Sequence, residues 1–153
     1  MNANPGTDDG SFGNQPRSHH GEKTPEGKSH YQVLIVEDEM LIAENLRYVL
    51  EDKGYQVVGI AASGEEAVFQ AGKKCPDLIL MDIRIEGSFD GIEAARRIRK
   101  LHREDMPVVF LSAYAAEQFP HLKQLKADSF RYIRKPYSPR ELVAVVHGML
   151  IRH

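Results

Sequence analysis

The sequence lacks the features of a secreted, disulfide-stabilised or membrane-spanning protein. It has 153 residues, no tryptophan and a single cysteine, Cys75, so no disulfide can form within the chain. No apolar run approaches the roughly 20 residues that a membrane-spanning helix needs. The N-terminus also lacks the apolar centre of a signal peptide. These absences favour a cytoplasmic protein with no contact to a membrane.

An excess of charge of either sign is absent as well. The formal net charge is -2, so no basic field over the whole molecule attracts nucleic acid or an anionic membrane. A basic cluster does lie between Arg96 and Arg103, but no aromatic residues are interleaved with it. Such a cluster is typical of a solvated helix face rather than of a nucleic-acid contact. We therefore expect no nucleic-acid partner.

Apolar residues are scarce near the N-terminus. Glycine, proline, serine, asparagine and mixed charges dominate residues 1–30. Such a segment cannot bury enough apolar surface to offset the entropy lost on ordering it. We predict a disordered tail over 1–30 and one folded domain over 31–153. The folded part is too short to hold a second, effector domain.

What the folded part does have is a regular alternation of apolar runs and amphipathic stretches. The middle run, DLILMDIRI from Asp77 to Ile85, shows no polar alternation and is typical of a parallel strand covered on both faces. Similar runs predict five strands, at 31–36, 55–60, 77–82, 107–112 and 129–134. Helix N-termini are indicated by a capping residue with an acidic residue three positions later, in the pairs Ser63 and Glu66, Asp90 and Glu93, and Ser138 and Glu141.

Five strands alternating with five helices predict an α/β domain with a doubly wound, five-stranded parallel sheet. One helix is less regular than the others. Pro120 lies near the middle of the stretch from Ala115 to Lys126, between the fourth and fifth strands. Because proline removes a backbone donor and clashes with the preceding turn, we expect this helix to be short, kinked or split.

Polar side chains follow four of the predicted strands. Glu37 and Asp38 come after the first strand, Asp82 ends the third, Ser112 ends the fourth, and Lys135 follows the fifth. The carboxyl ends of parallel strands lie on one edge of a sheet, where such folds bind ligands. Two carboxylates about 4 Å apart repel by roughly 4 kcal/mol at an effective dielectric near 20. Clustered oxygen ligands without His or Cys favour Mg²⁺ as the cation that relieves this repulsion.

A Mg²⁺ site beside a carboxylate, a hydroxyl and an ammonium has the parts that phosphoryl transfer requires. Each residue alone has an ordinary explanation. Asp38 could be a helix cap, Ser112 a loop hydroxyl and Lys135 a solvated side chain. Their joint occurrence on one sheet edge favours a phosphoryl-accepting site with Asp82 as the nucleophile.

These residues lie in motifs that resemble those of the receiver domains of two-component response regulators. The motifs are VEDE (36–39), LILMDI (78–83), DGIEAARRIR (90–99), FLSAY (110–114) and YIRKP (132–136). The resemblance covers residues 31 to about 152. It implies a flavodoxin-like, three-layer αβα fold with strand order 2-1-3-4-5. Because the chain ends with the last predicted helix, we also expect a stand-alone receiver without an output domain, similar to a chemotaxis regulator.

The resemblance implies a role for each residue of the site. Asp82 is the expected phosphoacceptor. The expected Mg²⁺ ligands are the side chains of Glu37, Asp38 and Asp82 and the backbone carbonyl of Arg84. The residues expected to bind the phosphoryl group are Ser112, Ala113 and Lys135. A cis peptide bond is expected before Pro136.

Ser112 and Tyr132 are the expected switch pair. The resemblance implies that phosphorylation draws Ser112 toward the new charge and that the Tyr132 ring rotates into the space left. This changes the surface of the fourth helix, fifth strand and fifth helix, which is also where a homodimer would be expected. Arg84 and Tyr114, two residues after Asp82 and Ser112, occupy positions that influence the phosphoryl lifetime in the family.

The implied partners are a sensor histidine kinase or a histidine phosphotransfer protein as phosphodonor, and a downstream protein target that the sequence does not identify. A receiver promotes its own phosphorylation and slow dephosphorylation and is not otherwise an enzyme. Two alternatives stay open. One is a receiver-fold binding module that is not regulated by phosphorylation. The other is a phosphatase of the haloacid dehalogenase type, which places a second Asp where this chain has Arg84.

Overall fold

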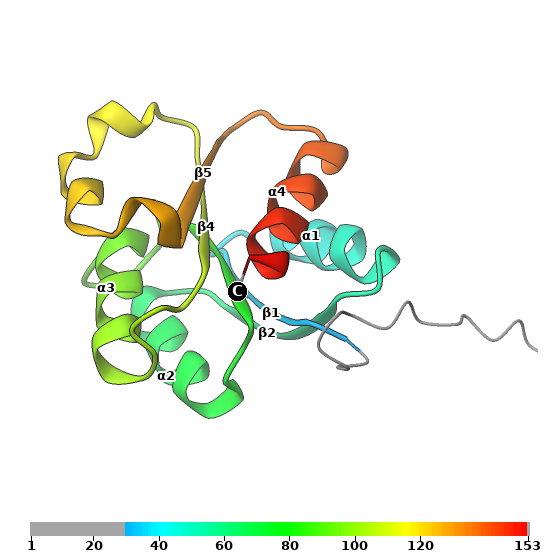
Figure 1. Cartoon of the computed structure of the whole chain (residues 1–153), viewed down its shortest axis with the longest axis horizontal. Helices are drawn as coiled ribbons and strands as arrows, with labels where there is room; N and C mark the ends of the chain where they lie inside the picture. The colour runs from blue at the N-terminus through cyan, green and yellow to red at the C-terminus, as the bar shows by residue number, and fades with distance from the viewer. Residues whose placement is uncertain (1–29, 153) are drawn as a thin grey trace, which may run out of the picture.

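A five-stranded parallel sheet with the order β2-β1-β3-β4-β5 forms the middle layer of the protein (Figure 1). The computed structural model describes residues 30–152, so the tail predicted over 1–30 lies, except for His30, outside the described residues. The strands are β1 (Gln32–Val36), β2 (Gln56–Ala61), β3 (Leu78–Asp82), β4 (Val108–Ser112) and β5 (Phe130–Arg134). Each bound lies within one residue of the predicted run, and the predicted fold class and strand order are confirmed.

Helices cover both faces of the sheet. The pair α1 (Met40–Asp52) and α4 (Pro139–Ile151) covers one face, and the pair α2 (Gly64–Lys74) and α3 (Gly91–Leu101) covers the other (Figure 1). Alternate residues of β1 supply the two cores, because successive strand side chains point to opposite faces. Val33 lies in the core under α1 and α4, and Leu34 lies in the core under α2 and α3. No helix within residues 30–152 combines the length and the apolarity needed to cross a bilayer.

The predicted capping residues act as the sequence indicated. In each case the side-chain oxygen accepts a hydrogen bond from the backbone N–H three residues later, a bond that usually contributes about 1 kcal/mol. The pairs are Ser63 with Glu66 at 3.1 Å, Asp90 with Glu93 at 2.9 Å, and Ser138 with Glu141 at 3.1 Å. These caps fix where α2, α3 and α4 begin, and so they fix the loops that precede them.

The prediction of five α-helices is wrong for the stretch between β4 and β5. Within residues 30–152 the structure has four α-helices, and this stretch forms three short 3₁₀ helices: η1 (Ala116–Gln118), η2 (Pro120–Gln124) and η3 (Ala127–Ser129). Pro120 has no N–H to donate to the preceding turn. Phe119 before it has φ -122° and ψ 77°, outside the helical region. The split at Pro120 is therefore confirmed, but the α-helical form is not.

Specific contacts hold this 3₁₀ segment on α3. Phe119 is buried in the core under α2 and α3. The Arg99 guanidinium donates to the Ser129 carbonyl at 2.7 Å and to the Met106 carbonyl at 2.9 Å. His121 Nε2 lies 3.1 Å from Asp90 Oδ2 at the start of α3. The segment is thus tied to the same helix whose N-terminus adjoins the carboxyl edge of the sheet.

Candidate functional site

The parallel register brings the predicted site residues to one edge of the sheet. Val36 of β1 pairs with Met81 of β3, so the residues that follow them, Glu37 and Asp82, adjoin each other. On the other side of β3, Asp82 pairs with Leu111, the residue before Ser112. The Lys135 backbone N–H donates to the Ser112 carbonyl at 2.7 Å. This bond extends the pairing of β4 and β5 past Arg134 and places Lys135 beside Ser112.

The Lys135 ammonium links the two buried acids of this edge. Its Nζ lies 2.8 Å from Asp82 Oδ2 and 3.9 Å from Glu37 Oε2. Asp82 also accepts a hydrogen bond at Oδ1 from the Arg84 backbone N–H, at 3.1 Å. Only 6% of Asp82 and 2% of Glu37 are exposed. Because both acids are nearly withdrawn from water, Lys135 is the main compensation for their charge.

The negative charge of the ionised form of Glu37 is compensated only in part by the protein. Oε1 accepts the Glu39 backbone N–H at 3.0 Å, but Oε2 is buried and has no hydrogen-bond partner in the described part of the chain. Burial, and then the neighbouring Asp82, raise the pKa of Glu37 to about 8. The Lys135 ammonium acts in the opposite direction without offsetting them. The negative charge of the two acids is therefore not fully compensated, which favours the binding of a further cation.

These features fit the predicted Mg²⁺. Mg²⁺ is commonly held by one or two carboxylates and keeps several waters, so it needs no complete cage of protein ligands. Among residues 30–152 no three His, Cys, Asp or Glu side chains form a ready-made metal cluster, so the protein alone supplies part of a coordination shell. Asp38 is half-buried and follows Glu37 in the chain. The roles of Asp38 and of the Arg84 carbonyl as ligands stay predictions.

Ser112 and Tyr132, the predicted switch pair, are joined through the backbone of Tyr114. The Tyr114 N–H donates to Ser112 Oγ at 3.1 Å, and the Tyr114 carbonyl accepts a hydrogen bond from the Tyr132 hydroxyl. The Tyr132 ring packs against the core under α2 and α3, with its centroid 6.5 Å from that of Phe119. Tyr114 is therefore hydrogen-bonded to both members of the predicted pair.

Two side chains from the loops after β3 and β4 are in contact beside the site. The Arg84 guanidinium lies over the Tyr114 ring, 4.2 Å from its centroid, and links the loop after β3 to the loop after β4. The family resemblance indicated both positions, two residues after Asp82 and Ser112, but it did not predict the contact. Ala113 is exposed beside Tyr114. The peptide bond before Pro136 is cis, as the resemblance implied.

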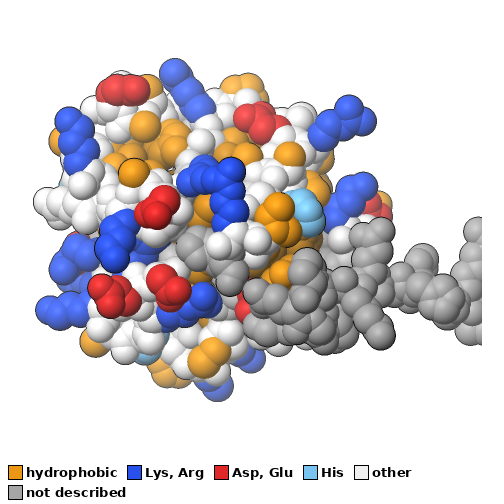
Figure 2. Space-filling view, viewed as in Figure 1, with side chains coloured by type: hydrophobic (Ala, Val, Ile, Leu, Met, Phe, Trp, Pro, Cys, Tyr) orange, Lys and Arg blue, Asp and Glu red, His pale blue; other side chains and the backbone are white. Residues whose placement is uncertain are grey.

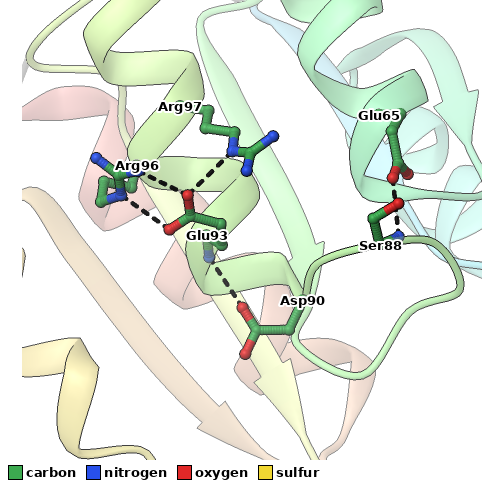
Figure 3. A network of polar contacts seen from close by, with 6 residues as sticks. All are labelled: Glu65, Ser88, Asp90, Glu93, Arg96 and Arg97. Atoms are coloured by element: carbon green, nitrogen blue, oxygen red, sulfur yellow. Dashed lines mark hydrogen bonds and ion pairs between the residues drawn. The ribbon is translucent and has the colours of Figure 1, made fainter.

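A polar network holds the loop that follows β3 (Figure 3). The Ser88 N–H donates to Glu65 Oε1 of α2 at 2.8 Å. At the start of α3, the Gly91 N–H donates to the Ile83 carbonyl at 2.8 Å. Further along α3, hydrogen bonds from Arg96 and Arg97 lower the pKa of Glu93 to about 2. Glu65 and Gly91 were not expected from the sequence as supports of the site, although a glycine directly after the capping Asp90 is a usable indication of close packing.

A doubly wound parallel sheet with buried acids, an ammonium and a hydroxyl at its carboxyl edge defines an α/β domain built to bind a charged ligand there. Comparison with known protein families then identifies the family within this class. The model of the response regulator receiver domain matches residues 33–147. The chain belongs to this family.

Solved structures agree with this assignment. The chain is 35% identical to the signal receiver domain of a modulated diguanylate cyclase from Desulfovibrio desulfuricans, covering 80% of this chain and 95% of that one, with a TM-score of 0.70. It is 28% identical to a CheY-like receiver domain protein from Methanospirillum hungatei, with the same coverage and TM-score. It is 35% identical to the anti-anti-sigma factor PhyR from Bartonella quintana, with a TM-score of 0.68, covering 80% of this chain but only 49% of that protein.

Proposed function

We propose that this receiver accepts a phosphoryl group on Asp82 from a phosphohistidine of a sensor histidine kinase or a histidine phosphotransfer protein, in a Mg²⁺-dependent reaction. The observation that supports this most is the position of Lys135 Nζ, 2.8 Å from Asp82 Oδ2. A nearly buried carboxylate with an ammonium at this distance is held for attack on an anionic donor. We place this reaction in the cytoplasm.

The chemistry follows from the side chains around Asp82. One carboxylate oxygen of Asp82 forms a bond to phosphorus while the bond between phosphorus and the donor's imidazole nitrogen breaks, and the imidazole leaves. Lys135 and the Ser112 hydroxyl are positioned to stabilise oxygens of the transferred group. The small side chain of Ala113 leaves the approach open. Mg²⁺, held by Glu37, Asp38, Asp82 and the Arg84 carbonyl, would neutralise negative charge on the phosphoryl oxygens when bound.

The proposed output is a change in the surface next to Tyr132. When the Ser112 hydroxyl turns to a phosphoryl oxygen, the Tyr114 N–H loses its acceptor. The Tyr114 backbone can then move, and because its carbonyl accepts the hydrogen bond from the Tyr132 hydroxyl, Tyr132 moves with it. The affected surface consists here of η1–η3, β5 and α4. The stretch between β4 and β5 forms the 3₁₀ helices η1–η3 in place of an α-helix, and α4 is the last helix of the chain. We propose that a downstream protein, or a second copy, reads this surface, or that the phosphoryl group is passed on in a relay.

Phosphorylation by a small donor tests the proposal. We expect incubation with acetyl phosphate and Mg²⁺ to give an acid-stable, base-labile adduct by intact mass, and no adduct without Mg²⁺. Asp82→Asn is expected to abolish the adduct, while Asp128→Asn, at an exposed site in η3, leaves it unchanged. An adduct that persists in Asp82→Asn, or that forms equally without Mg²⁺, would overturn the assignment. Absence of an adduct with every donor would favour the unphosphorylated binding module instead.

The link through Tyr114 gives a separate prediction for Tyr132→Phe. This change removes the hydrogen bond to the Tyr114 carbonyl and keeps the ring, so we expect a loss of stability of about 1 kcal/mol. Amide hydrogen exchange over 113–119 should become faster. Tyr48→Phe, on the exposed face of α1, serves as the control and should change neither quantity. Equal exchange in both variants would show that the hydroxyl does not hold this loop.

A further inference from the structure

The outer face of α2 carries a large apolar side chain that is mostly exposed. Phe69 is 67% exposed at the centre of the helix, and Leu101 at the end of α3 is 63% exposed. Phe69 stands between two open hollows. One, of about 490 Å³, lies between α2 and the edge strand β2, and the other, of about 570 Å³, lies between α2 and the end of α3. The face therefore has a projecting ring and a recess on each side of it.

The charges on the same helix are arranged symmetrically about Phe69. The first turn of α2 carries Glu65 and Glu66, and the last turn carries Lys73 and Lys74. Glu65 and Lys73 each lie four residues from Phe69, so all three side chains share one face of the helix. Positive and negative side chains are likewise interspersed over the α2 and α3 side of the molecule (Figure 2). A surface with this pattern is complementary to itself when one copy is turned end to end.

We propose that a second copy of this chain docks on α2, with the two α2 helices antiparallel, Phe69 at the two-fold axis and a Glu65–Lys73 ion pair on each side of it. An isologous contact of this kind uses the same patch on both copies. In it each carboxylate of one copy faces an ammonium of the other. The antiparallel arrangement also places the negative end of each helix dipole near the positive end of its partner.

Each of the two charged side chains has one contact within its own chain. Lys73 Nζ lies 5.9 Å from the centroid of the Phe69 ring. Glu65 is exposed and is fixed at the other end of the patch by the hydrogen bond from the Ser88 N–H (Figure 3). For Glu65, less side-chain freedom is therefore lost on association than for an unrestrained charged residue.

The surface area that the two α2 helices can bury sets the expected strength of the dimer. A stable complex usually buries about 800 Å² on each partner, and one pair of three-turn helices buries less. We therefore assign a weak, concentration-dependent dimer to this face. It lies apart from the surface of η1–η3, β5 and α4.

Sedimentation velocity of the full chain over a range of concentrations tests the proposal. We expect reversible dimerisation, and Phe69→Ser should raise the dimer dissociation constant by about tenfold or more, since each 1.4 kcal/mol lost is a factor of ten. Tyr48→Ser removes another exposed aromatic ring, 71% exposed on α1, and should leave the constant unchanged. A chain that stays monomeric up to about 1 mM, or a Phe69→Ser dimer as tight as the wild type, overturns the proposal.

Charge reversal tests the ion pairs specifically, because a nonspecific effect of the substitutions cannot produce the same pattern of results. Glu65→Lys and Lys73→Glu each place like charges opposite each other, so each variant alone should dimerise more weakly than the wild type. A mixture of the two should form a heterodimer, because one copy then presents two cations and the other two anions. The variant with both changes in one chain should dimerise like the wild type, although it lacks the Glu65–Ser88 bond, and so it controls for that loss. If neither the mixture nor the double variant recovers association, α2 is not the interface.

Discussion

Replacing Lys135 with methionine is expected to slow phosphorylation of Asp82 by acetyl phosphate by about two to three orders of magnitude, the usual effect of removing one charge-stabilising donor. Two distances support this expectation. Lys135 Nζ lies 2.8 Å from Asp82 and 3.9 Å from Glu37. Without the ammonium, two buried acids face each other with few compensating donors, and the oxygens of an incoming phosphoryl group lose a positive partner.

Two matched variants separate this effect from a general loss of charge or of folding. Lys100→Met removes a lysine from the exposed end of α3 and should leave the rate unchanged. Lys135→Arg keeps the charge but replaces a compact ammonium with a planar guanidinium, so we expect a rate between those of the wild type and Lys135→Met. The rates come from intact mass over time, with urea unfolding of each variant alongside. A wild-type rate in Lys135→Met would show that the ammonium has no part in the transfer.

The edge of the sheet could be predicted from the sequence because parallel pairing leaves little freedom there. Once the strand ends at Val36, Asp82, Ser112 and Arg134 are recognised, register alone brings the residues at and after them together. The starts of α2, α3 and α4 were predictable for a similar reason. A capping side chain and the N–H it binds lie within three residues, so the sequence contains both partners.

Contacts between residues distant in sequence could not be predicted in this way. The bond from Ser88 to Glu65 joins a loop to the preceding helix, and the Arg84–Tyr114 contact joins two loops. Neither pair has a local pattern that fixes its geometry. The 3₁₀ form after β4 is an intermediate case. Pro120 indicated a break, but whether the pieces are α or 3₁₀ depends on the buried Phe119 and the bond from Arg99 to Ser129.

These non-local contacts have a common consequence for the site. The loop after β3 is held by α2 through Glu65 and by α3 through the Gly91 N–H, while the loop after β4 is held by Tyr132. The strand ends supply the reactive groups, and the neighbouring helices fix the loops that surround them. A change in a helix that never touches the donor should therefore alter phosphorylation by moving Asp82.

Gly91→Ala is the sharpest test of this consequence, and we expect it to lower the free energy of unfolding by about 3 kcal/mol. A Cβ at position 91 would lie 2.3 Å from the Asp82 carbonyl oxygen and 2.8 Å from Met81 Cγ. The first neighbour is backbone of the acceptor strand and cannot rotate away. Either the end of β3 or the start of α3 must shift, and we expect phosphorylation of Asp82 to slow as well.

Gly148→Ala in α4 is the matched control, because no atom lies within 4 Å of a Cβ built at that position. There the change only restricts the unfolded chain and favours the helix, so we expect a gain of about 0.5 to 1 kcal/mol and an unchanged phosphorylation rate. Urea unfolding and the acetyl phosphate assay measure both effects. Two glycine-to-alanine changes in helices should thus have opposite signs. If Gly91→Ala were as stable as Gly148→Ala, α3 would not pack directly against Asp82, and the positioning of the acceptor would have to come from β3 alone.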